Sequence, residues 1–211
     1  NALVISRCSW NTEEQDFEMT DQFLLDCPGD WAPLDLKIAF SPDRQFGYVA
    51  ALTDMGTVPI SAGQSYYPVI WRSDDGGDTW SEAEAVPLAG ENGIFGVQYY
   101  LNDDELGEIY GAPIPAREEI PFTTAYDFGL TVDVWGNPHI AVIVGISAEP
   151  CSIITDISPT SGYMYTAAFL LSSADLGQAG SWDGGLMGRP TSFRGTFGDF
   201  ITEDNRIQIS R

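Results

Sequence analysis

Apolar and polar residues alternate in short runs along most of the chain, and turn-forming residues separate these runs. Residues 36–40 and 47–52 surround Ser-Pro-Asp-Arg, in which Pro fixes φ and Asp bonds back to the backbone. Residues 130–134 and 139–144 surround Trp-Gly-Asn-Pro in the same way. Each pair predicts a β-hairpin, and no window shows a sustained helical period of about 3.6 residues. We therefore expect an all-β fold.

A further apolar run and a second kind of turn follow each predicted hairpin. Residues 67–72 and 164–172 supply these runs, so the order hairpin, strand, turn, strand occurs twice. Repetition at intervals of tens of residues indicates a radial or solenoid array. Four strands per unit fit a propeller blade.

Three other stretches lie outside these two units. Residues 2–6 are a short β-type run, followed by a polar, acidic stretch over residues 11–21. Residues 198–211 predict the start of a third unit, with its turn at residues 202–205. Residues 90–128, which carry three prolines, predict a long insertion with one hairpin of its own, and insertions on a rigid scaffold often carry binding surfaces.

The turn of the first unit follows a fixed pattern. It contains Ser73, Asp75, Gly77, Thr79 and Trp80. The Asp75 carboxylate can accept hydrogen bonds from backbone N–H groups of its own turn, and Gly77 permits a positive φ. The second unit repeats the pattern with two residues inserted, as Ser173, Asp175, Gly177 and Trp182. We expect Trp80 and Trp182 to occupy equivalent places in successive units.

This pattern resembles the Asp-box of sialidase-like β-propellers, over roughly residues 36–88 and 130–187. The resemblance implies four-stranded antiparallel blades with Asp-box turns. Residues 1–211 would then be one incomplete propeller domain that continues into, or packs with, further blades. Sialidases imply an arginine triad, a Tyr–Glu pair and an Asp acid. The Phe-Arg-Ile-Pro motif that supplies the first arginine is absent, so we assign no catalytic residue.

The chain is strongly acidic, with 31 Asp and Glu against 9 Lys and Arg and a formal charge of −22. This charge repels nucleic acid and anionic membranes, and no run of about 18 apolar residues predicts a membrane span. Acidity suits calcium, for which the carboxylates of Asp74, Asp75 and Asp78 and the predicted turn at residues 102–105 are candidates. The first group lacks the spacing of a calcium-binding loop, and a solvated turn is the alternative for each group.

Cysteine and histidine are scarce. Cys8, Cys27 and Cys151 form no CxxC pair, and His139 is the only histidine, which excludes zinc and haem sites of the usual spacing. Cys8 and Cys27 could form a disulfide if neighbouring strands carry them, leaving Cys151 without a partner. We interpret His139 as a packed or hydrogen-bonded residue.

Aromatic residues are dense between positions 66 and 110. They are Tyr66, Tyr67, Trp71, Tyr99, Tyr100 and Tyr110. Most should belong to the core, but exposed rings are typical of sugar- or protein-binding faces. The chain begins without an initiator Met or a signal segment, so we expect a mature or trimmed chain, or an internal piece of a longer one.

These features favour an exported, cell-surface or extracellular module for binding or assembly, adhesin-like or part of a surface complex. Its partner would be a protein or a glycan. An enzyme of the sialidase-like superfamily, a glycoside hydrolase or lyase, is the alternative. A passive scaffold within a secreted multidomain cargo protein is a further one.

Overall fold

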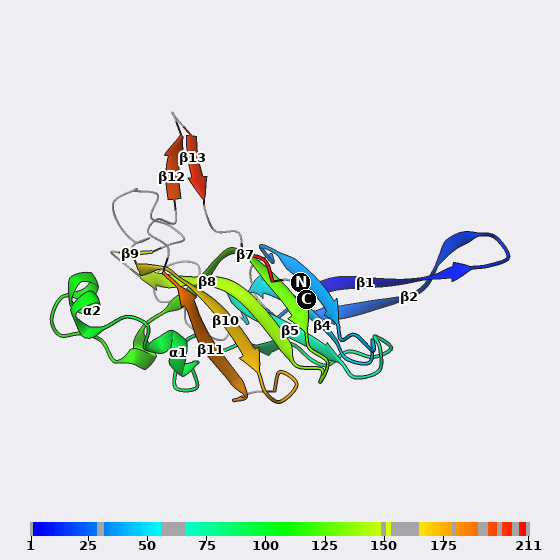
Figure 1. The fold of residues 1–211 in the computed structure, drawn as a ribbon, viewed down its shortest axis with the longest axis horizontal. Coiled ribbons are helices and arrows are strands. Elements are labelled where there is room, and N and C mark those ends of the chain that lie inside the picture. Colours follow the sequence, from blue (N-terminus) through cyan, green and yellow to red (C-terminus); the bar gives the residue numbers. More distant parts are fainter. Residues whose placement is uncertain are drawn as a thin grey trace.

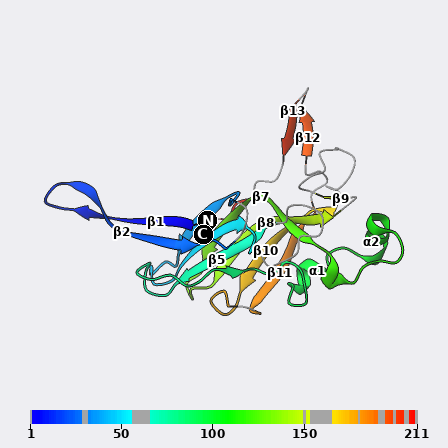
Figure 2. The ribbon, with the colours of Figure 1, turned by 180° about the vertical axis from the view of Figure 1, so that it is seen from behind.

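The structure is a computed structural model that describes residues 2–28, 32–55, 66–148, 151–152, 165–178, 180–189, 194–197, 200–203 and 207–209. These residues are mainly antiparallel β-sheet, as the sequence predicts. A long hairpin projects from one end of the body, and the helices lie at the other end (Figure 1). The reverse view shows the same arrangement (Figure 2).

Two four-stranded antiparallel meanders form the body. The first sheet has the order β3 (Leu36–Phe40), β4 (Gly47–Thr53), β5 (Tyr67–Ser73) and β6 (Glu84–Ala85). The second sheet has the order β7 (Phe122–Val132), β8 (Pro138–Ala148), β10 (Ala167–Ser173) and β11 (Trp182–Gly188). A short strand, β9 (Cys151–Ser152), pairs with the end of β8. Both predicted hairpins are therefore confirmed, each followed by the strand that the sequence indicates.

The core lies between the two sheets. Every residue of β4 is buried, and β7 contacts β3, β4 and β5. Large side chains that are fully buried here include Tyr48, Trp71, Phe128 and Phe169. The two sheets therefore share one hydrophobic cluster, which fixes the turns of one sheet against the strands of the other.

The segment between the sheets differs from the predicted insertion. Its described residues form two short helices, α1 (Phe95–Gln98) and α2 (Asp103–Tyr110), and a 3-10 turn η1 (Arg117–Glu119), without a hairpin. Asn102 caps α2: its side chain accepts a hydrogen bond from the Glu105 backbone, and the Glu105 side chain accepts one from the Asn102 backbone. The acidic turn expected at residues 102–105 is therefore wrong. Residues 122–128 belong to β7, so the insertion is also shorter than predicted.

Two hairpins lie outside the sheets. We call the first, β1 (Ala2–Asn11) with β2 (Asp16–Asp26), the arm. Its strands cover much of the polar, acidic stretch over residues 11–21, for which the sequence analysis predicts no element. The second is β12 (Arg194–Phe197) with β13 (Phe200–Glu203). Strand β13 runs to Glu203, so the turn predicted at residues 202–205 is wrong for Thr202 and Glu203, while residues 204–205 lie outside the described part.

Candidate functional site

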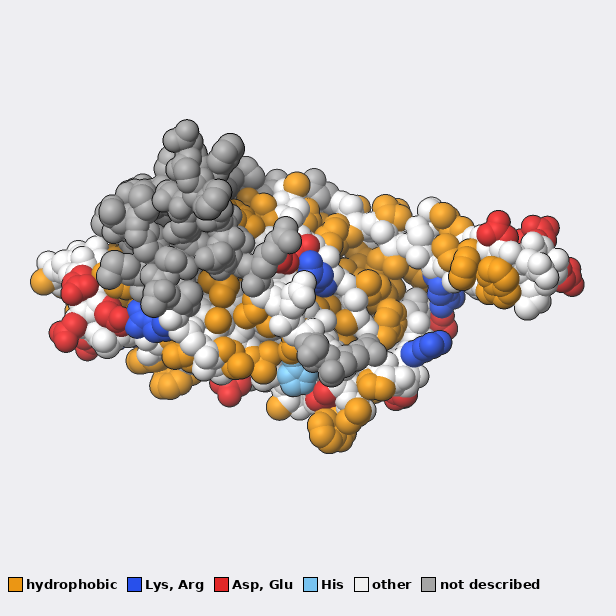
Figure 3. Space-filling view, turned by 45° about the horizontal axis from the view of Figure 1, so that its top comes forward, with side chains coloured by type: hydrophobic (Ala, Val, Ile, Leu, Met, Phe, Trp, Pro, Cys, Tyr) orange, Lys and Arg blue, Asp and Glu red, His pale blue; other side chains and the backbone are white. Residues whose placement is uncertain are grey.

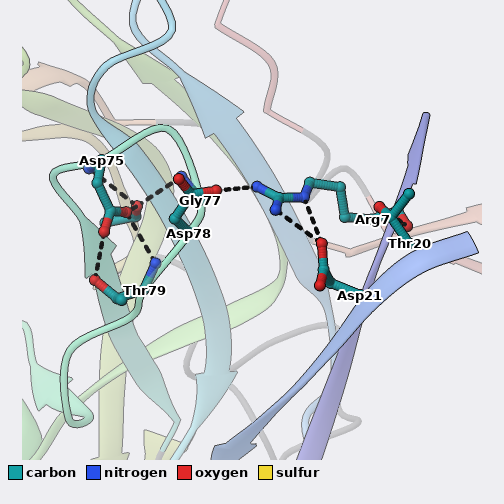
Figure 4. A network of polar contacts seen from close by, with 8 residues as sticks. Arg7, Thr20, Asp21, Asp75, Gly77, Asp78 and Thr79 are labelled. Carbon is teal, nitrogen blue, oxygen red and sulfur yellow. Dashed lines mark hydrogen bonds and ion pairs between the residues drawn. The ribbon is translucent and has the colours of Figure 1, made fainter. Parts of the chain in front are cut away.

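The turn over residues 73–80, the first box, is held by side-chain acceptors (Figure 4). The Asp75 carboxylate accepts hydrogen bonds from the Thr79 backbone N–H at 2.9 Å and from the Thr79 hydroxyl at 2.6 Å. This confirms that Asp75 caps its own turn. The Ser73 hydroxyl donates to Asp75 at 2.8 Å and accepts from the Gly77 N–H at 2.8 Å. The Thr79 hydroxyl, followed by the Thr79 N–H and Ser73, lowers the pKa of Asp75 to about 2.

The turn over residues 173–182, the second box, keeps half of this arrangement. The Ser173 hydroxyl accepts hydrogen bonds from the N–H groups of Asp175 at 3.1 Å and Gly177 at 2.7 Å. None of the described residues donates to the Asp175 carboxylate. Ser173 instead bonds to the Ser181 hydroxyl at 2.6 Å, and Ser181 donates to the Gln178 carbonyl at 2.5 Å. A chain of hydroxyls therefore replaces the carboxylate.

The two predicted tryptophans lie against the glycines of their own boxes. A Cβ on Gly77 would lie 3.7 Å from the Trp80 ring, and the Trp182 indole N–H donates to the Gly177 carbonyl at 3.2 Å. Their places correspond, as expected, but their bonding differs. The buried indole nitrogen of Trp80 has no hydrogen-bond partner among the described residues.

The second box packs against the first sheet. The Tyr48 hydroxyl donates to the carbonyls of Gly136 at 2.9 Å and Leu176 at 2.8 Å. The Arg72 guanidinium reaches the same Leu176 carbonyl at 3.3 Å. Burial raises the pKa of Tyr48 well above its ordinary value. Because the phenol stays protonated, it remains a donor to both carbonyls.

The first set of calcium candidates does not converge on one point. Asp74 pairs with Arg72 at 2.7 Å, Asp75 accepts from Thr79, and Asp78 pairs with Arg7 of the arm (Figure 4). The described residues contain no group of three or more His, Cys, Asp or Glu arranged for a metal ion. These carboxylates therefore serve the turn and its contact with the arm.

The second set of calcium candidates lies at the start of α2. Asn102 and Glu105 form its cap, Asp103 pairs with Arg117, and Glu105 also pairs with Arg189 at 2.6 Å. Acidic residues in the first turn of a helix are favourable because its N-terminus carries partial positive charge. The acidic cluster is thus a helix start.

The disulfide that the sequence leaves open between Cys8 and Cys27 does not form, and both cysteines are free. Cys8 lies opposite Met19 in the arm, whereas Cys27 follows the end of β2 and is buried in the core. The two residues therefore lie at different levels of the hairpin, beyond the reach of an S–S bond. The Cys151 side chain lies outside the described residues.

The aromatic residues divide into core and surface. Tyr66, Tyr67 and Trp71 are buried, so a binding role for them is wrong. Tyr100 and Tyr110 are half-buried against the core. Tyr99 is 52% exposed and stacks on Phe95 of α1, with ring centroids 4.4 Å apart. It is the one member of the predicted set that is more than half exposed, and the Arg117 guanidinium also lies over its ring, 5.2 Å from the centroid.

His139 is partly buried and lies 3.3 Å from Asp133. Asp133 caps the β7–β8 turn by accepting from the N–H groups of Trp135 and Asn137, each at 2.8 Å. Burial would raise the pKa of Asp133, but these bonds and the contact with His139 outweigh it and lower the pKa. His139 is thus a hydrogen-bonded residue of a turn, as interpreted from the sequence.

The largest surface that sequence reasoning missed is one face of the arm. The register pairs Val4 with Leu24, Cys8 with Met19, and Trp10 with Phe17. The Gln22 amide reaches both the Ser6 hydroxyl and the Met19 sulfur, which places these residues on one side of the hairpin. Phe17 is 68% exposed and Leu24 is 75% exposed. We call this the open face of the arm.

The opposite side of the arm faces the body. Leu25 is buried, Leu3 and Ile5 pack against the core, and Arg7 pairs with Asp21 and Asp78. Hydrophobic side chains gather where the arm meets the body and continue toward an acidic tip (Figure 3). Alternation alone does not locate this face, because the extra residue Thr20 interrupts it in β2.

Comparison with protein-family models gave no match, and comparison with the curated proteins gave none either. Among the described residues, no helix has the length and apolar character needed to cross a membrane.

Proposed function

We propose that the chain is a propeller-type module, exported to the cell surface or the extracellular space, that binds or assembles with a partner protein. The open face of the arm is the observation that carries this proposal. Trp10, Phe17, Met19 and Leu24 are each more than half exposed on one side of a two-stranded hairpin. Two strands alone are marginally stable in water, and an exposed apolar patch is typical of an interaction surface.

The repetition in the body supports the propeller part of the proposal. Two meanders of four antiparallel strands carry boxes in which a serine hydroxyl accepts a glycine N–H at 2.8 and 2.7 Å. The turn of one unit packs on the strands of the other through Tyr48. Such neighbour-to-neighbour packing is how radial repeats build a continuous core.

The charge and the shape of the arm favour a protein partner. Its tip carries Glu13, Glu14 and Asp16, which are exposed, while its open face mixes aliphatic and aromatic side chains. Interfaces between proteins combine an apolar centre with a polar rim. A sugar-binding face would use rings flanked by polar groups, and the aliphatic Val4 and Leu24 fit that arrangement less well.

A glycosidase or lyase is the second candidate, and one cluster bears on it. Lys37 lies 2.6 Å from Asp35 and 3.4 Å from Asp127, where β3 meets β7. Burial would raise the pKa of Asp35, but the hydrogen bonds that its carboxylate accepts from Lys37 and the Leu36 backbone outweigh burial and lower the pKa. A glycosidase needs one carboxylic acid with a raised pKa. This pair therefore favours a structural tie over acid catalysis.

The test uses labelled protein on intact cells of the organism that encodes it. The wild type should bind saturably, and a Trp10→Ser/Phe17→Ser variant should bind at least about 10-fold more weakly, because hot-spot aromatics dominate interfaces. Val134→Ser/Trp135→Ser is the matched control, since these residues are 63% and 75% exposed but lie in the β7–β8 turn.

Two treatments of the cells separate the partner classes. Protease treatment should abolish binding, whereas periodate oxidation of surface glycans should leave it intact. Equal losses in the two double variants, or unsaturable binding, would contradict the proposal and favour the passive scaffold. Turnover of fluorogenic glycosides that disappears in Asp127→Asn would instead support the enzyme.

A further inference from the structure

Strand β1 of the arm contacts the first box through an arginine, as β5 contacts the second box. Arg72 of β5 bonds to the second box at the Leu176 carbonyl, and Arg7 of β1 pairs with the first box at Asp78. The sequences agree around these arginines: residues 3–7 read Leu-Val-Ile-Ser-Arg and residues 68–72 read Pro-Val-Ile-Trp-Arg. We therefore take β1 as the counterpart of β5.

The strands that follow agree as well. Val4 pairs with Leu24 of β2, and Val69 pairs with Ala85 of β6. Counting on from these partners, Leu25 corresponds to Val86 and Cys27 to Leu88. All four are buried, at 5%, 0%, 1% and 2% exposure respectively. The arm thus repeats the outer half of a four-stranded sheet.

The arm lacks a strand on its inner side. β5 is paired on both edges, by β4 and β6, whereas β1 pairs only with β2 among the described residues. A groove of about 550 Å³ lies between β1, β3 and the first box. It is the counterpart of the space that Tyr48 fills between the two sheets.

The lining of this groove matches the surroundings of Tyr48. Tyr48 lies opposite Arg72 in the β4–β5 register and next to Ile70 and Gly177, and the groove is lined by Arg7, Ile5 and Gly77.

The two carbonyls that Tyr48 binds also have counterparts. Gly136 and Arg44 are the positive-φ residues of the first turn of each sheet, at 88° and 64°. Leu176 and Gly76 are the first positive-φ residues of the two boxes, at 53° and 72°. Both Arg44 and Gly76 line the groove.

We propose that this groove accepts an added β-strand of a partner polypeptide, which pairs antiparallel with the free edge of β1. A tyrosine of that strand, opposite Arg7, fills the groove, and its hydroxyl donates to the carbonyls of Arg44 and Gly76. This inference goes beyond the proposed function, because the groove lies on the body-facing side of the arm and is a second contact site, separate from the open face. Strand addition of this kind draws affinity from backbone bonds and specificity from one side-chain pocket.

The chemistry of the lining fits a phenol. Ile38, Phe40 and Trp80 supply apolar walls, and none of the described Asp and Glu residues lines the groove. A second copy of this chain does not satisfy the site with β4, because every residue of β4 is buried between β3 and β5. The site therefore calls for a strand with the character of β4 that none of the described residues supplies, and we assign it to a partner polypeptide.

The test measures fluorescence anisotropy of a labelled synthetic peptide with the sequence of residues 47–53, Gly-Tyr-Val-Ala-Ala-Leu-Thr, against the whole chain. We expect saturable binding that weakens by about 10-fold or more when the peptide tyrosine is alanine. Replacing it by phenylalanine should cost about 5-fold, since one hydroxyl hydrogen bond is lost.

Two protein variants locate the site. Ile38→Glu puts a carboxylate into the groove and should weaken the peptide by about 10-fold or more. Leu36→Glu changes the same face of the same strand outside the groove lining and should leave the affinity within about 2-fold. These residues are 54% and 48% exposed, so both variants should fold.

Equal affinity of the tyrosine and alanine peptides, or equal effects of the two protein variants, overturns the inference. So does dimerisation of the chain that blocks the peptide. The inference fails alone if cells still bind the protein through the open face while the peptide does not bind. The proposed function fails alone if the peptide binds and the cells do not.

Discussion

The two boxes form the same turn but hold it with different side-chain hydrogen bonds. In both, a buried serine hydroxyl, Ser73 or Ser173, accepts the N–H of the glycine four residues later. The first box adds the Asp75 carboxylate, which bonds Thr79 twice. In the second box the equivalent Asp175 has no such bond, and Ser181 holds the turn instead.

This difference separates the essential part of the motif from the replaceable part. The serine–glycine bond orders the backbone as the strand ends, and it survives an insertion of two residues. The aspartate closes the far side of the turn only when threonine stands four residues later. The boxes differ further in their neighbours, because Gly177 lies against the other sheet and Gly77 lies against Phe40 and Trp80 of its own unit.

The glycines should give the largest contrast. Both have positive φ, 94° at Gly77 and 80° at Gly177, so alanine costs about 1–2 kcal/mol in backbone strain at each. At Gly177 the added Cβ would also lie 3.1 Å from Ile70 and 3.3 Å from Tyr48, adding about 1–3 kcal/mol of overpacking. Urea unfolding should therefore show a greater loss for Gly177→Ala than for Gly77→Ala. Equal losses of unfolding free energy in the two variants would mean that Ile70 and Tyr48 move to accommodate the added methyl group at no cost.

The serines should give the next effect. Ser73→Ala and Ser173→Ala each leave buried N–H groups without an acceptor, which costs about 1–3 kcal/mol. We expect the loss of stability for Ser173→Ala to lie near the upper end of this range, because Ser173 also bonds to Ser181. The loss for Ser73→Ala should lie near the lower end, because Asp75 still bonds to Thr79. Urea midpoints with an unchanged m-value would measure this. A larger loss at Ser73 would contradict the comparison.

The aspartates should give the smallest effect, and it should depend on pH. Asp75→Asn should lower the unfolding temperature and Asp175→Asn should not change it. Since the folded pKa of Asp75, about 2, lies below its ordinary value, its contribution is present above about pH 4 and is lost as pH falls toward 2. The wild type and Asp75→Asn should therefore differ at pH 6 and converge near pH 2. A constant difference over this range would show that ionisation is not involved.

The features that the sequence predicts correctly are those that depend on residues close together in the chain. The apolar runs around residues 40 and 135 and the turn residues between them locate the hairpins, and the capping role of Asp75 follows from spacing alone. Asn102 and Glu105 have the spacing of a capping box. The same residues also fit an acidic turn that could bind calcium, which is the interpretation that the structure corrects. Helix α2 spans only eight residues, too few for periodicity to reveal it.

The candidate surfaces depend on contacts between distant residues, which spacing does not contain. Nothing in the sequence distinguishes Tyr48 from other strand residues. Its hydroxyl nevertheless joins the two sheets by bonding to Gly136 and Leu176, which are 88 and 128 positions away in the sequence. The exposure of Trp10 and Phe17 follows from where the arm projects relative to the body. Arg7 reveals the correspondence of β1 with β5 only once its partner Asp78 is known.

One extra residue in β2, Thr20, decides on which side of the arm the residues near its tip lie. The register advances by two residues on β2, from Asp21 to Met19, while it advances by one on β1, from Arg7 to Cys8. Strict alternation would place Phe17 and Met19 on the same side as Phe23 and Leu25, facing the body. The extra residue turns them to the open face instead. If the hairpin lost this bulge while keeping Thr20, Phe17 and Met19 would move to the side that faces the body, whereas deleting Thr20 itself would leave them on the open face. The pairing register therefore determines which side of the arm these apolar residues occupy.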